Sequence, residues 1–338
     1  MPNVIVYYTH QVPREGPDLL RPYCLVLENK SEETPTKQEV IQASKEAFAL
    51  CWFVPDIIDE EVISSCHNLR ILAGFPRGYD NVDVVAATRR GIWVTIGPET
   101  MVEPTADLTW ALILSITRKL IVADAFVRTS RHSGWHPTRL MGHQVFRKTL
   151  GIIGMGKLGR AIAKRATGFE MNLLYCEKAP IEKAVEMELK LRFMPLDALL
   201  KESDFVCIAT PLTEDTFHQI SSRELALMKP SAYLINPARG SEVDEEAVAY
   251  ALRNGIIAGY AADVFEMEDK QFSTRPLKVT PGLIDQPERT ILSPHIATGV
   301  KETRVEQARY QALNVLQALR GERPVGAVNE VPLYPPLI

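Results

Sequence analysis

The chain has 338 residues, a formal net charge of −4, 46% hydrophobic residues and 24% charged residues. A chain of this length is expected to form two domains, each able to bury a core of its own. The composition is that of an ordinary globular protein, and the weak negative charge offers no basic field for nucleic acid or for an anionic membrane surface.

Short β-type runs alternate with helical patterns over the first hundred residues. Strands are predicted at 3–8, 24–29, 50–55, 69–75 and 92–97. Helices are predicted at 34–49, where a threonine provides the cap, and at 59–66 and 82–91. Alternation of this kind predicts a parallel sheet with helices on its faces.

A long apolar helix is predicted from about Glu103 to Arg131, with Pro104 in its opening turn. Because such a helix is too apolar to stand in water alone, we expect it to pack against a neighbouring domain or a second subunit, and we expect a homodimer. A second series of strands is predicted at 149–156, 172–177, 191–195, 204–210, 232–238, 257–265 and 290–295. The last predicted helix ends near Gly321.

Cysteine usage and hydropathy indicate the cellular compartment and argue against a structural metal site and a membrane span. The five cysteines are odd in number and form no Cys-x-x-Cys pair, which argues against a disulfide framework or a structural zinc site. No uncharged apolar run reaches the ~18 residues that a membrane span needs. We therefore expect a cytoplasmic protein with no metal site and no membrane partner.

A glycine motif opens the second series of strands. Gly154, Gly156 and Gly159 form Gly-x-Gly-x-x-Gly, with Lys157 and Leu158 between them, after a predicted strand and before a predicted helix. The first glycine allows a tight turn, the second lets the backbone approach a pyrophosphate, and the third lets helix and strand pack closely. The motif predicts a dinucleotide site, although glycines that only pack a helix onto a sheet would look similar.

An acidic residue follows where a dinucleotide fold places one. Glu177 lies 18 residues after Gly159, at the end of the next predicted strand. It would accept hydrogen bonds from the adenosine ribose hydroxyls, which favours NAD over NADP. The neighbouring cation Lys178 leaves room for secondary use of NADP.

Three further residues each come just after a predicted strand: Arg239, Glu268 and His295. The carboxyl ends of parallel strands line the ligand crevice of an open α/β sheet. A histidine oriented by a carboxylate can move a proton, and a nearby guanidinium can bind an anionic substrate. Taken alone, His295 could be a structural loop histidine, but the ordered trio behind a dinucleotide fold favours a catalytic site.

Together these motifs resemble the D-isomer-specific 2-hydroxyacid dehydrogenases over essentially the whole chain. The residues that carry the resemblance are GMGKLG at 154–159, NPARG around Arg239, AADVFEMED near Glu268 and SPH at His295. The resemblance implies two doubly wound parallel-sheet domains. A Rossmann NAD-binding domain, residues 102–296, would be inserted into a flavodoxin-like substrate domain, residues 1–101 and 297–338.

The resemblance also implies roles for single residues. Catalysis would depend on Arg239, Glu268 and His295. Substrate binding would involve Arg77, Gly78, Arg304 and Trp135, the last of these with the partner subunit as its source. Besides the glycine loop and Glu177, the residues at the cofactor would be Thr105, Ala209, Thr210, Pro211, Ala238 and Asp263, the last as an anchor.

Within the family the chain is most similar to the phosphonate (phosphite) dehydrogenases, on stretches such as RGYDN at 77–81 and PHIATGVKETR at 294–304. The leading hypothesis is therefore NAD-dependent oxidation of phosphite to phosphate, because Arg77, Arg239 and Arg304 would suit a small dianion. The alternative is a D-2-hydroxyacid dehydrogenase that acts on a small acid, with dianionic and phosphono acids among the candidates. Arg77 in place of an expected lysine and Leu140 in place of an expected aromatic favour this alternative. An NAD-sensing binding protein is a third reading, against which the intact trio argues.

Overall fold

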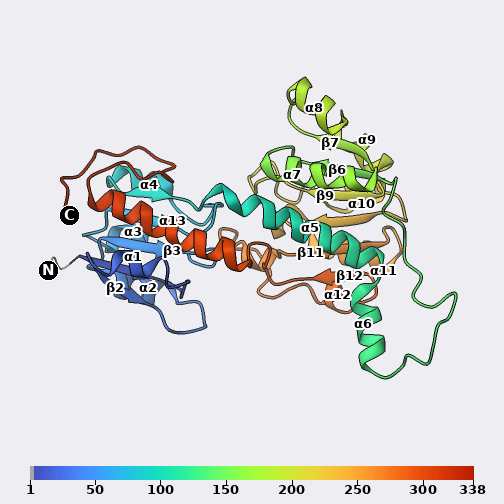
Figure 1. Cartoon of the computed structure of the whole chain (residues 1–338), viewed down its shortest axis with the longest axis horizontal. Coiled ribbons are helices and arrows are strands. Elements are labelled where there is room, and N and C mark those ends of the chain that lie inside the picture. The colour runs from blue at the N-terminus through green and yellow to red at the C-terminus, as the bar shows by residue number, and fades with distance from the viewer. Residues whose placement is uncertain (1–3) are drawn as a thin grey trace. The chain divides into compact units, whose positions relative to one another are not determined.

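The protein is described here by a computed structural model over residues 4–338, in which contacts divide the chain into two compact units (Figure 1). Unit 1 holds the residues up to Met101 together with 270–273 and 298–338, and unit 2 holds 102–269 and 274–297. Each unit is built on one parallel sheet, which confirms the predicted fold class. The sequence did not indicate that 270–273 would group with unit 1 or Ala297 with unit 2. Asn3, the first residue of the predicted strand at 3–8, lies outside the described residues.

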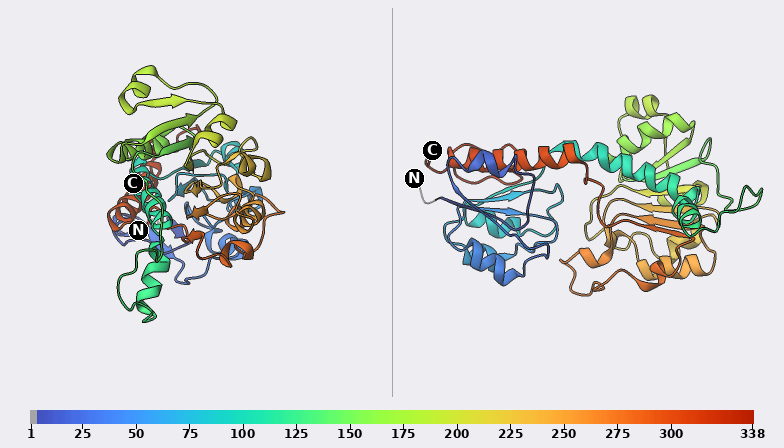
Figure 2. Two further views of the ribbon diagram at one scale, coloured as in Figure 1. Left: turned by 90° about the vertical axis from the view of Figure 1, so that its right-hand side faces the viewer. Right: turned by 60° about the horizontal axis from the view of Figure 1, so that its bottom comes forward.

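Unit 1 contains a five-stranded parallel sheet in the order β2-β1-β3-β4-β5, which is the flavodoxin-like order. The strands are β1 (Ile5–Tyr8), β2 (Leu25–Glu28), β3 (Ala49–Trp52), β4 (Ile71–Gly74) and β5 (Trp93–Thr95). Its helices are α1 (Pro17–Leu20), α2 (Lys37–Ser44), α3 (Glu60–Ser65), α4 (Val84–Arg89), η1 (Glu99–Met101) and α13 (Lys301–Leu319). Every residue of β3 and β4 is buried, as expected for parallel strands covered on both faces (Figure 2).

The helix starts of unit 1 follow from their capping residues. The Thr36 side chain accepts a hydrogen bond from Glu39 N, and the Glu39 carboxylate accepts one from Thr36 N at 2.7 Å. This reciprocal capping box confirms the predicted threonine cap of α2. Asp59 caps α3 and Asp83 caps α4. Each aspartate side chain accepts a hydrogen bond from the backbone N–H three residues later.

Unit 2 contains a seven-stranded parallel sheet in the order β12-β11-β10-β9-β6-β7-β8. Its strands are β6 (Thr149–Ile153), β7 (Asn172–Cys176), β8 (Leu191–Phe193), β9 (Phe205–Ile208), β10 (Tyr233–Asn236), β11 (Gly259–Ala262) and β12 (Thr290–Leu292). The order from β8 to β11 is that of a dinucleotide-binding sheet, in which the strand order reverses between β6 and β9 while all strands stay parallel. Ligands of such sheets bind at the carboxyl ends of the strands next to this reversal.

The helices of unit 2 cover both faces of this sheet (Figures 1 and 2). They are α5 (Val102–Thr117), α6 (Leu120–Arg128), α7 (Lys157–Ala166), α8 (Lys183–Leu189), α9 (Leu196–Glu202), α10 (Ser222–Leu227), α11 (Glu245–Arg253) and α12 (Pro281–Ile284), with the short turns η2 (Thr167–Phe169), η3 (Gly240–Glu242) and η4 (Glu266–Glu268). Helix α5 packs on α7 and on β10, β11 and β12, and it buries Trp110 and Ile113.

The single long helix predicted from Glu103 to Arg131 is wrong, because the chain forms two helices there. Lys119, between α5 and α6, adopts a left-handed conformation with φ +52°, which ends the first helix and lets the second begin at a new angle. Neither glycine nor proline marks this break, so the continuous apolar pattern hid it.

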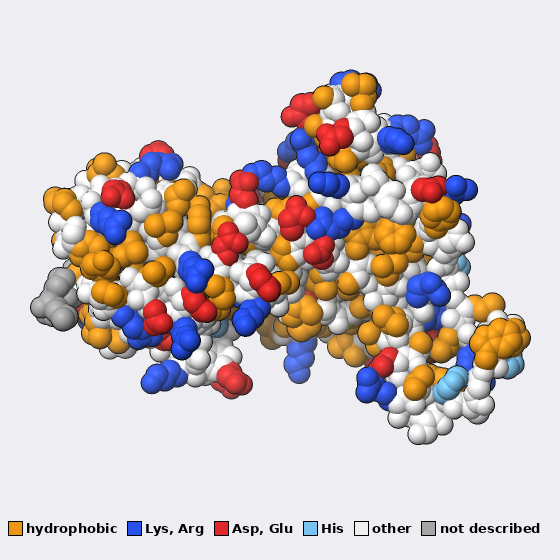
Figure 3. All heavy atoms as spheres, viewed as in Figure 1, with side chains coloured by type: hydrophobic (Ala, Val, Ile, Leu, Met, Phe, Trp, Pro, Cys, Tyr) orange, Lys and Arg blue, Asp and Glu red, His pale blue; other side chains and the backbone are white. Residues whose placement is uncertain are grey.

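Helix α6 and the segment after it, residues 120–146, expose several large apolar side chains (Figure 3). No residue of α6 is buried. Its apolar residues Leu120, Ile121 and Val127 are each more than half exposed. An exposed apolar helix of this kind is consistent with the predicted homodimer, which stays a prediction. Among residues 4–338, the helices all fall short of the length and hydropathy needed to cross a bilayer.

Candidate active site

Two of the predicted catalytic residues are hydrogen-bonded to each other. His295 Nδ1 lies 2.6 Å from Glu268 Oε2, and Glu268 Oε1 accepts a hydrogen bond from Phe265 N at 3.0 Å. Because an ionised carboxylate only accepts, the pairing places the imidazole proton on Nδ1. The His295 side chain remains 28% exposed, so Nε2 is the ring nitrogen available to a ligand.

The turn that carries His295 is fixed by Asp263, at the end of β11. The fully buried Asp263 carboxylate accepts hydrogen bonds from Ile296 N at 3.0 Å, Ala297 N at 2.8 Å and Ser293 Oγ at 2.5 Å. His295 itself has φ +54°, a left-handed conformation that is unfavourable for a histidine and needs such support. The structure thus shows Asp263 holding the His295 turn, while its predicted role as a cofactor anchor stays a prediction.

Arg239 follows β10, and its turn packs directly on the turn that carries Glu268. A Cβ added to Gly240 would lie 1.9 Å from the carbonyl carbon of Phe265, so only glycine permits this approach. Ser241 N donates to Asp269 Oδ2 at 2.7 Å, which ties the two turns together a second time. The backbone of Arg239 is therefore held next to the Glu268–His295 pair.

The glycine loop follows β6, at the point where the strand order reverses. Gly154 has φ +93°, which suits glycine, and a Cβ on Gly159 would lie 2.2 Å from Gly154 O, so the third glycine allows the close packing predicted for it. A Cβ on Gly156 would meet no protein atom within 4 Å. Helix α7 begins at Lys157 with no side-chain cap, so its first N–H groups can face an anion. Leu158 packs against the core of this domain.

Glu177 lies at the end of β7, where an adenosine ribose is expected. Its Oε1 accepts a hydrogen bond from Met155 N at 2.9 Å, so the carboxylate is fixed beside the glycine loop. The adjacent Lys178 pairs with Asp215, with 2.9 Å between Nζ and Oδ2. This pairing draws the lysine charge toward another carboxylate.

The other predicted cofactor residues lie in unit 2. Ala209, Thr210 and Pro211 directly follow β9, where Thr210 Oγ1 donates to Glu242 and Pro211 O accepts from Thr216 Oγ1. Ala238 is buried in the turn before Arg239, whose Nη1 donates to Ala238 O at 2.9 Å. Thr105 lies in the first turn of α5. Their contacts with a cofactor stay predictions.

Two predicted substrate residues lie in unit 1, around Phe75. Arg77 Nη1 donates to Gly97 O at 3.4 Å, and the Arg304 guanidinium lies 5.5 Å from the centre of the Phe75 ring. Neither arginine has a carboxylate within ion-pair distance among residues 4–338, and burial lowers the pKa of Arg304.

The two remaining predicted substrate residues show no such contacts. Gly78 is half-buried in the turn after Arg77. The indole of Trp135 is 87% exposed. Its predicted contact with substrate, as a residue supplied by a partner subunit, stays a prediction.

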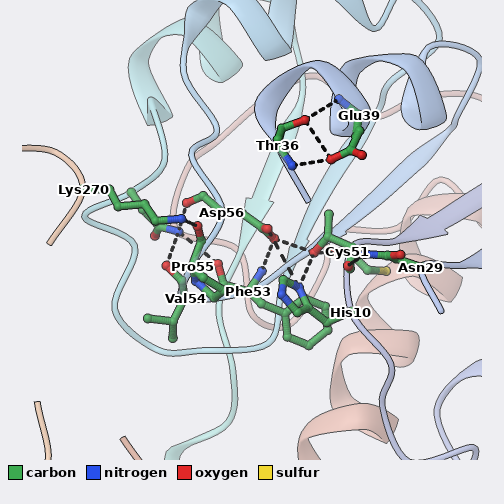
Figure 4. A network of polar contacts seen from close by, with 12 residues as sticks. His10, Asn29, Thr36, Glu39, Cys51, Phe53, Val54, Pro55, Asp56 and Lys270 are labelled. Atoms are coloured by element: carbon green, nitrogen blue, oxygen red, sulfur yellow. Dashed lines mark hydrogen bonds and ion pairs between the residues drawn. The ribbon is translucent and has the colours of Figure 1, made fainter. Parts of the chain in front are cut away.

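Sequence reasoning missed a buried carboxyl group in unit 1, Asp56 (Figure 4). Its Oδ2 accepts hydrogen bonds from Thr9 Oγ1 at 2.5 Å and Phe53 N at 2.8 Å, whereas Oδ1 is buried without a hydrogen-bond partner, 3.9 Å from His10 Nδ1. Burial raises the pKa of Asp56 to about 6. Residues 4–338 contain no group of three or more His, Cys, Asp or Glu side chains that could hold a metal ion.

Asp56 is expected to make the free energy of unfolding fall as the pH rises. Its folded-state pKa of about 6 exceeds the ordinary value of 3.8 for an aspartate, so its stabilising contribution is complete below pH 3.8 and is lost as the pH rises through about 6. The loss amounts to about 3 kcal/mol. Asp56→Asn should abolish this part of the pH dependence in urea unfolding, whereas the exposed control Glu32→Gln should retain it. Equal pH dependence in wild type and Asp56→Asn would contradict this assignment.

Comparison with known proteins agrees with this geometry. The family model described as "D-isomer specific 2-hydroxyacid dehydrogenase, NAD binding domain" matches residues 110–297. A protein of Thermococcus gammatolerans named glyoxylate reductase is 41% identical over 333 residues, which cover 96% of each chain.

Solved structures of other proteins have the same fold as this chain over nearly its whole length. The TT0316 protein of Thermus thermophilus has a TM-score of 0.86 and 34% identity, covering 96% of this chain and 100% of its own. An NADPH-dependent glyoxylate/hydroxypyruvate reductase of Sinorhizobium meliloti has a TM-score of 0.82 and 25% identity, covering 98% of this chain and 99% of its own. The chain therefore belongs to the D-isomer specific 2-hydroxyacid dehydrogenases and is an oxidoreductase with an NAD-binding domain.

Proposed function

We propose that the protein reduces a small 2-oxo acid of the glyoxylate class to the 2-hydroxy acid with NADH, and catalyses the reverse oxidation. The observation that carries the proposal is the 2.6 Å hydrogen bond between Glu268 and His295, with Glu268 on a turn packed against the turn of Arg239. The substrate class is supported by relatives that carry the name glyoxylate reductase.

The roles follow from the chemistry of each side chain. In the reduction, His295 would start as the imidazolium, with protons on both ring nitrogens, and would give the Nε2 proton to the substrate oxygen, which leaves a neutral ring protonated on Nδ1. Glu268 would keep the ring oriented and stabilise the imidazolium, which forms again in the reverse oxidation. The Arg239 guanidinium would bind the substrate carboxylate, because guanidinium and carboxylate match in shape and charge. The nicotinamide supplies the hydride. The glycine loop and the start of α7 would hold the pyrophosphate of the dinucleotide.

Phosphite oxidation, the leading prediction from the sequence, finds no support in these relatives. The alternative prediction, a 2-hydroxyacid dehydrogenase, agrees better with their names. One part of the sequence argument still favours a dianion, since Arg77 and Arg304 lack carboxylate partners among residues 4–338. A 2-oxo acid with a second acidic group would satisfy both considerations.

A substrate panel followed by NADH absorbance tests the proposal. We expect NADH oxidation with glyoxylate to exceed NADH formation from phosphite by orders of magnitude in kcat/KM; the reverse ranking would contradict the proposal.

A second comparison sets glyoxylate, with one carboxylate, against oxomalonate, with two. If Arg77 binds the second acidic group, Arg77→Leu should lower kcat/KM for oxomalonate by about tenfold or more, and for glyoxylate much less. The exposed control Arg14→Leu should change neither.

Cofactor choice provides an independent prediction. Glu177→Gln should keep an acceptor for Met155 N while removing the negative charge that disfavours a 2′-phosphate. We expect the ratio of kcat/KM for NADH to that for NADPH to fall by about tenfold, since one unfavourable charge contact is worth on the order of 1–2 kcal/mol. Glu182→Gln, an exposed carboxylate paired with Arg160, is the matched control. An unchanged ratio in Glu177→Gln would refute the ribose role.

A further inference from the structure

Glu242, the last residue of η3, is a fully buried carboxyl group that neither the motifs nor the proposed mechanism uses. Its Oε2 accepts a hydrogen bond from Arg239 N at 3.1 Å. Its Oε1 accepts from Gln219 Nε2 at 3.0 Å and from Thr210 Oγ1. A single carboxyl group thus joins the turn after β10 to the turn after β9.

Both of these turns lie where a bound dinucleotide is expected. Thr210 packs on the glycine loop, since a Cβ built on Gly154 would lie 2.9 Å from Thr210 Cγ2. Ala209 lies against the same glycine, with its carbonyl carbon 2.7 Å from that Cβ position. Thr210 as a residue is partly exposed, and its side chain lies between the glycine loop, which Cγ2 contacts, and the buried Glu242, to which Oγ1 donates.

The Thr210 hydroxyl has two possible hydrogen-bond arrangements, and Glu242 decides between them. Gln219 Nε2 donates to Thr210 Oγ1 at 2.7 Å, which occupies one lone pair. When Glu242 is ionised, it can only accept, so Thr210 must direct its hydrogen at Glu242. When Glu242 is protonated, its own O–H can donate to Thr210 Oγ1, and the hydrogen of Thr210 is free for another acceptor.

The surroundings of Glu242 raise its pKa, so both hydrogen-bond arrangements are accessible near neutral pH. Burial raises the pKa of Glu242 to about 8, against the opposing effects of the Thr210 hydrogen bond and the Arg239 charge, and Asp269 raises it further. On the same side of the sheet, the buried Tyr260 hydroxyl has a raised pKa. The pKa of His218, next to this turn, is raised by its hydrogen bond to Glu266.

We propose that Glu242 is a positioning residue for cofactor binding: its carboxyl group ties Arg239 to the Thr210 turn, and its proton frees the Thr210 hydroxyl to donate a hydrogen bond to NADH. The inference rests on the proposed location of the cofactor and adds to it. It does not depend on which 2-oxo acid is the substrate.

The test is the affinity for NADH, measured by fluorescence titration without substrate across pH 7 to 9. In the wild type the dissociation constant should rise by about three- to tenfold as Glu242 ionises and Thr210 is withdrawn from the cofactor, the range set by one hydrogen bond. In Glu242→Gln the amide can donate to Thr210 permanently and still accept from Arg239 N. Its affinity should therefore show no such rise.

A second pair of variants keeps the proposal testable if Glu242→Gln does not fold, as judged by circular dichroism. Thr210→Ser retains the hydroxyl and should retain the pH-dependent rise, whereas Thr210→Val removes it and should bind NADH weakly at every pH. An equal rise in wild type and Glu242→Gln, a rise that persists in Thr210→Val, or no rise in the wild type would each overturn the proposal. Because no substrate is present, failure here is separate from failure of the glyoxylate assignment.

Discussion

The contact between two backbone turns at Gly240 is the constraint on which the candidate site depends. A side chain there would collide with the backbone of Phe265, so Arg239 and Glu268 are neighbours only because residue 240 is glycine. The hydrogen bond from Ser241 N to Asp269 fixes the same approach from the other side. The turn of Arg239 is thus held against the turn of Glu268, which pairs with His295, and this explains how Arg239 and His295, 56 positions apart in the sequence, come to belong to one candidate site.

Buried carboxylates hold the backbone of this region in place. Asp263, Glu242 and Asp269 are each almost completely buried, and each accepts hydrogen bonds from backbone N–H groups in the site turns. Burying a carboxylate is costly unless such donors compensate for lost water, so the loops and the acids stabilise each other. The left-handed conformation of His295 persists for this reason, and only its ring is left to face a ligand.

Local patterns were enough to predict the parts of the protein that are determined by local rules. The glycine loop follows β6 and begins α7 as the Gly-x-Gly-x-x-Gly spacing indicated, and Glu268 pairs with His295 as their order after successive strands suggested. What was missed depends on tertiary contacts. The break at Lys119 has no local marker, and Glu242 and Asp56 look like ordinary loop acids until folding buries them. The family resemblance implied a cofactor role for Asp263, whereas its contacts with the His295 turn join residues 30 or more positions apart and have no local signal in the sequence.

In the proposed reaction His295, oriented by Glu268, transfers the proton, while other residues bind the cofactor. The most direct measurement is the turnover of His295→Ala with glyoxylate and NADH, made beside a titration of NADH binding to the same protein. We expect a turnover number lower by about 10²- to 10⁴-fold, with NADH affinity within a few-fold of the wild type. A variant that binds NADH normally and turns over within tenfold of the wild type would contradict it.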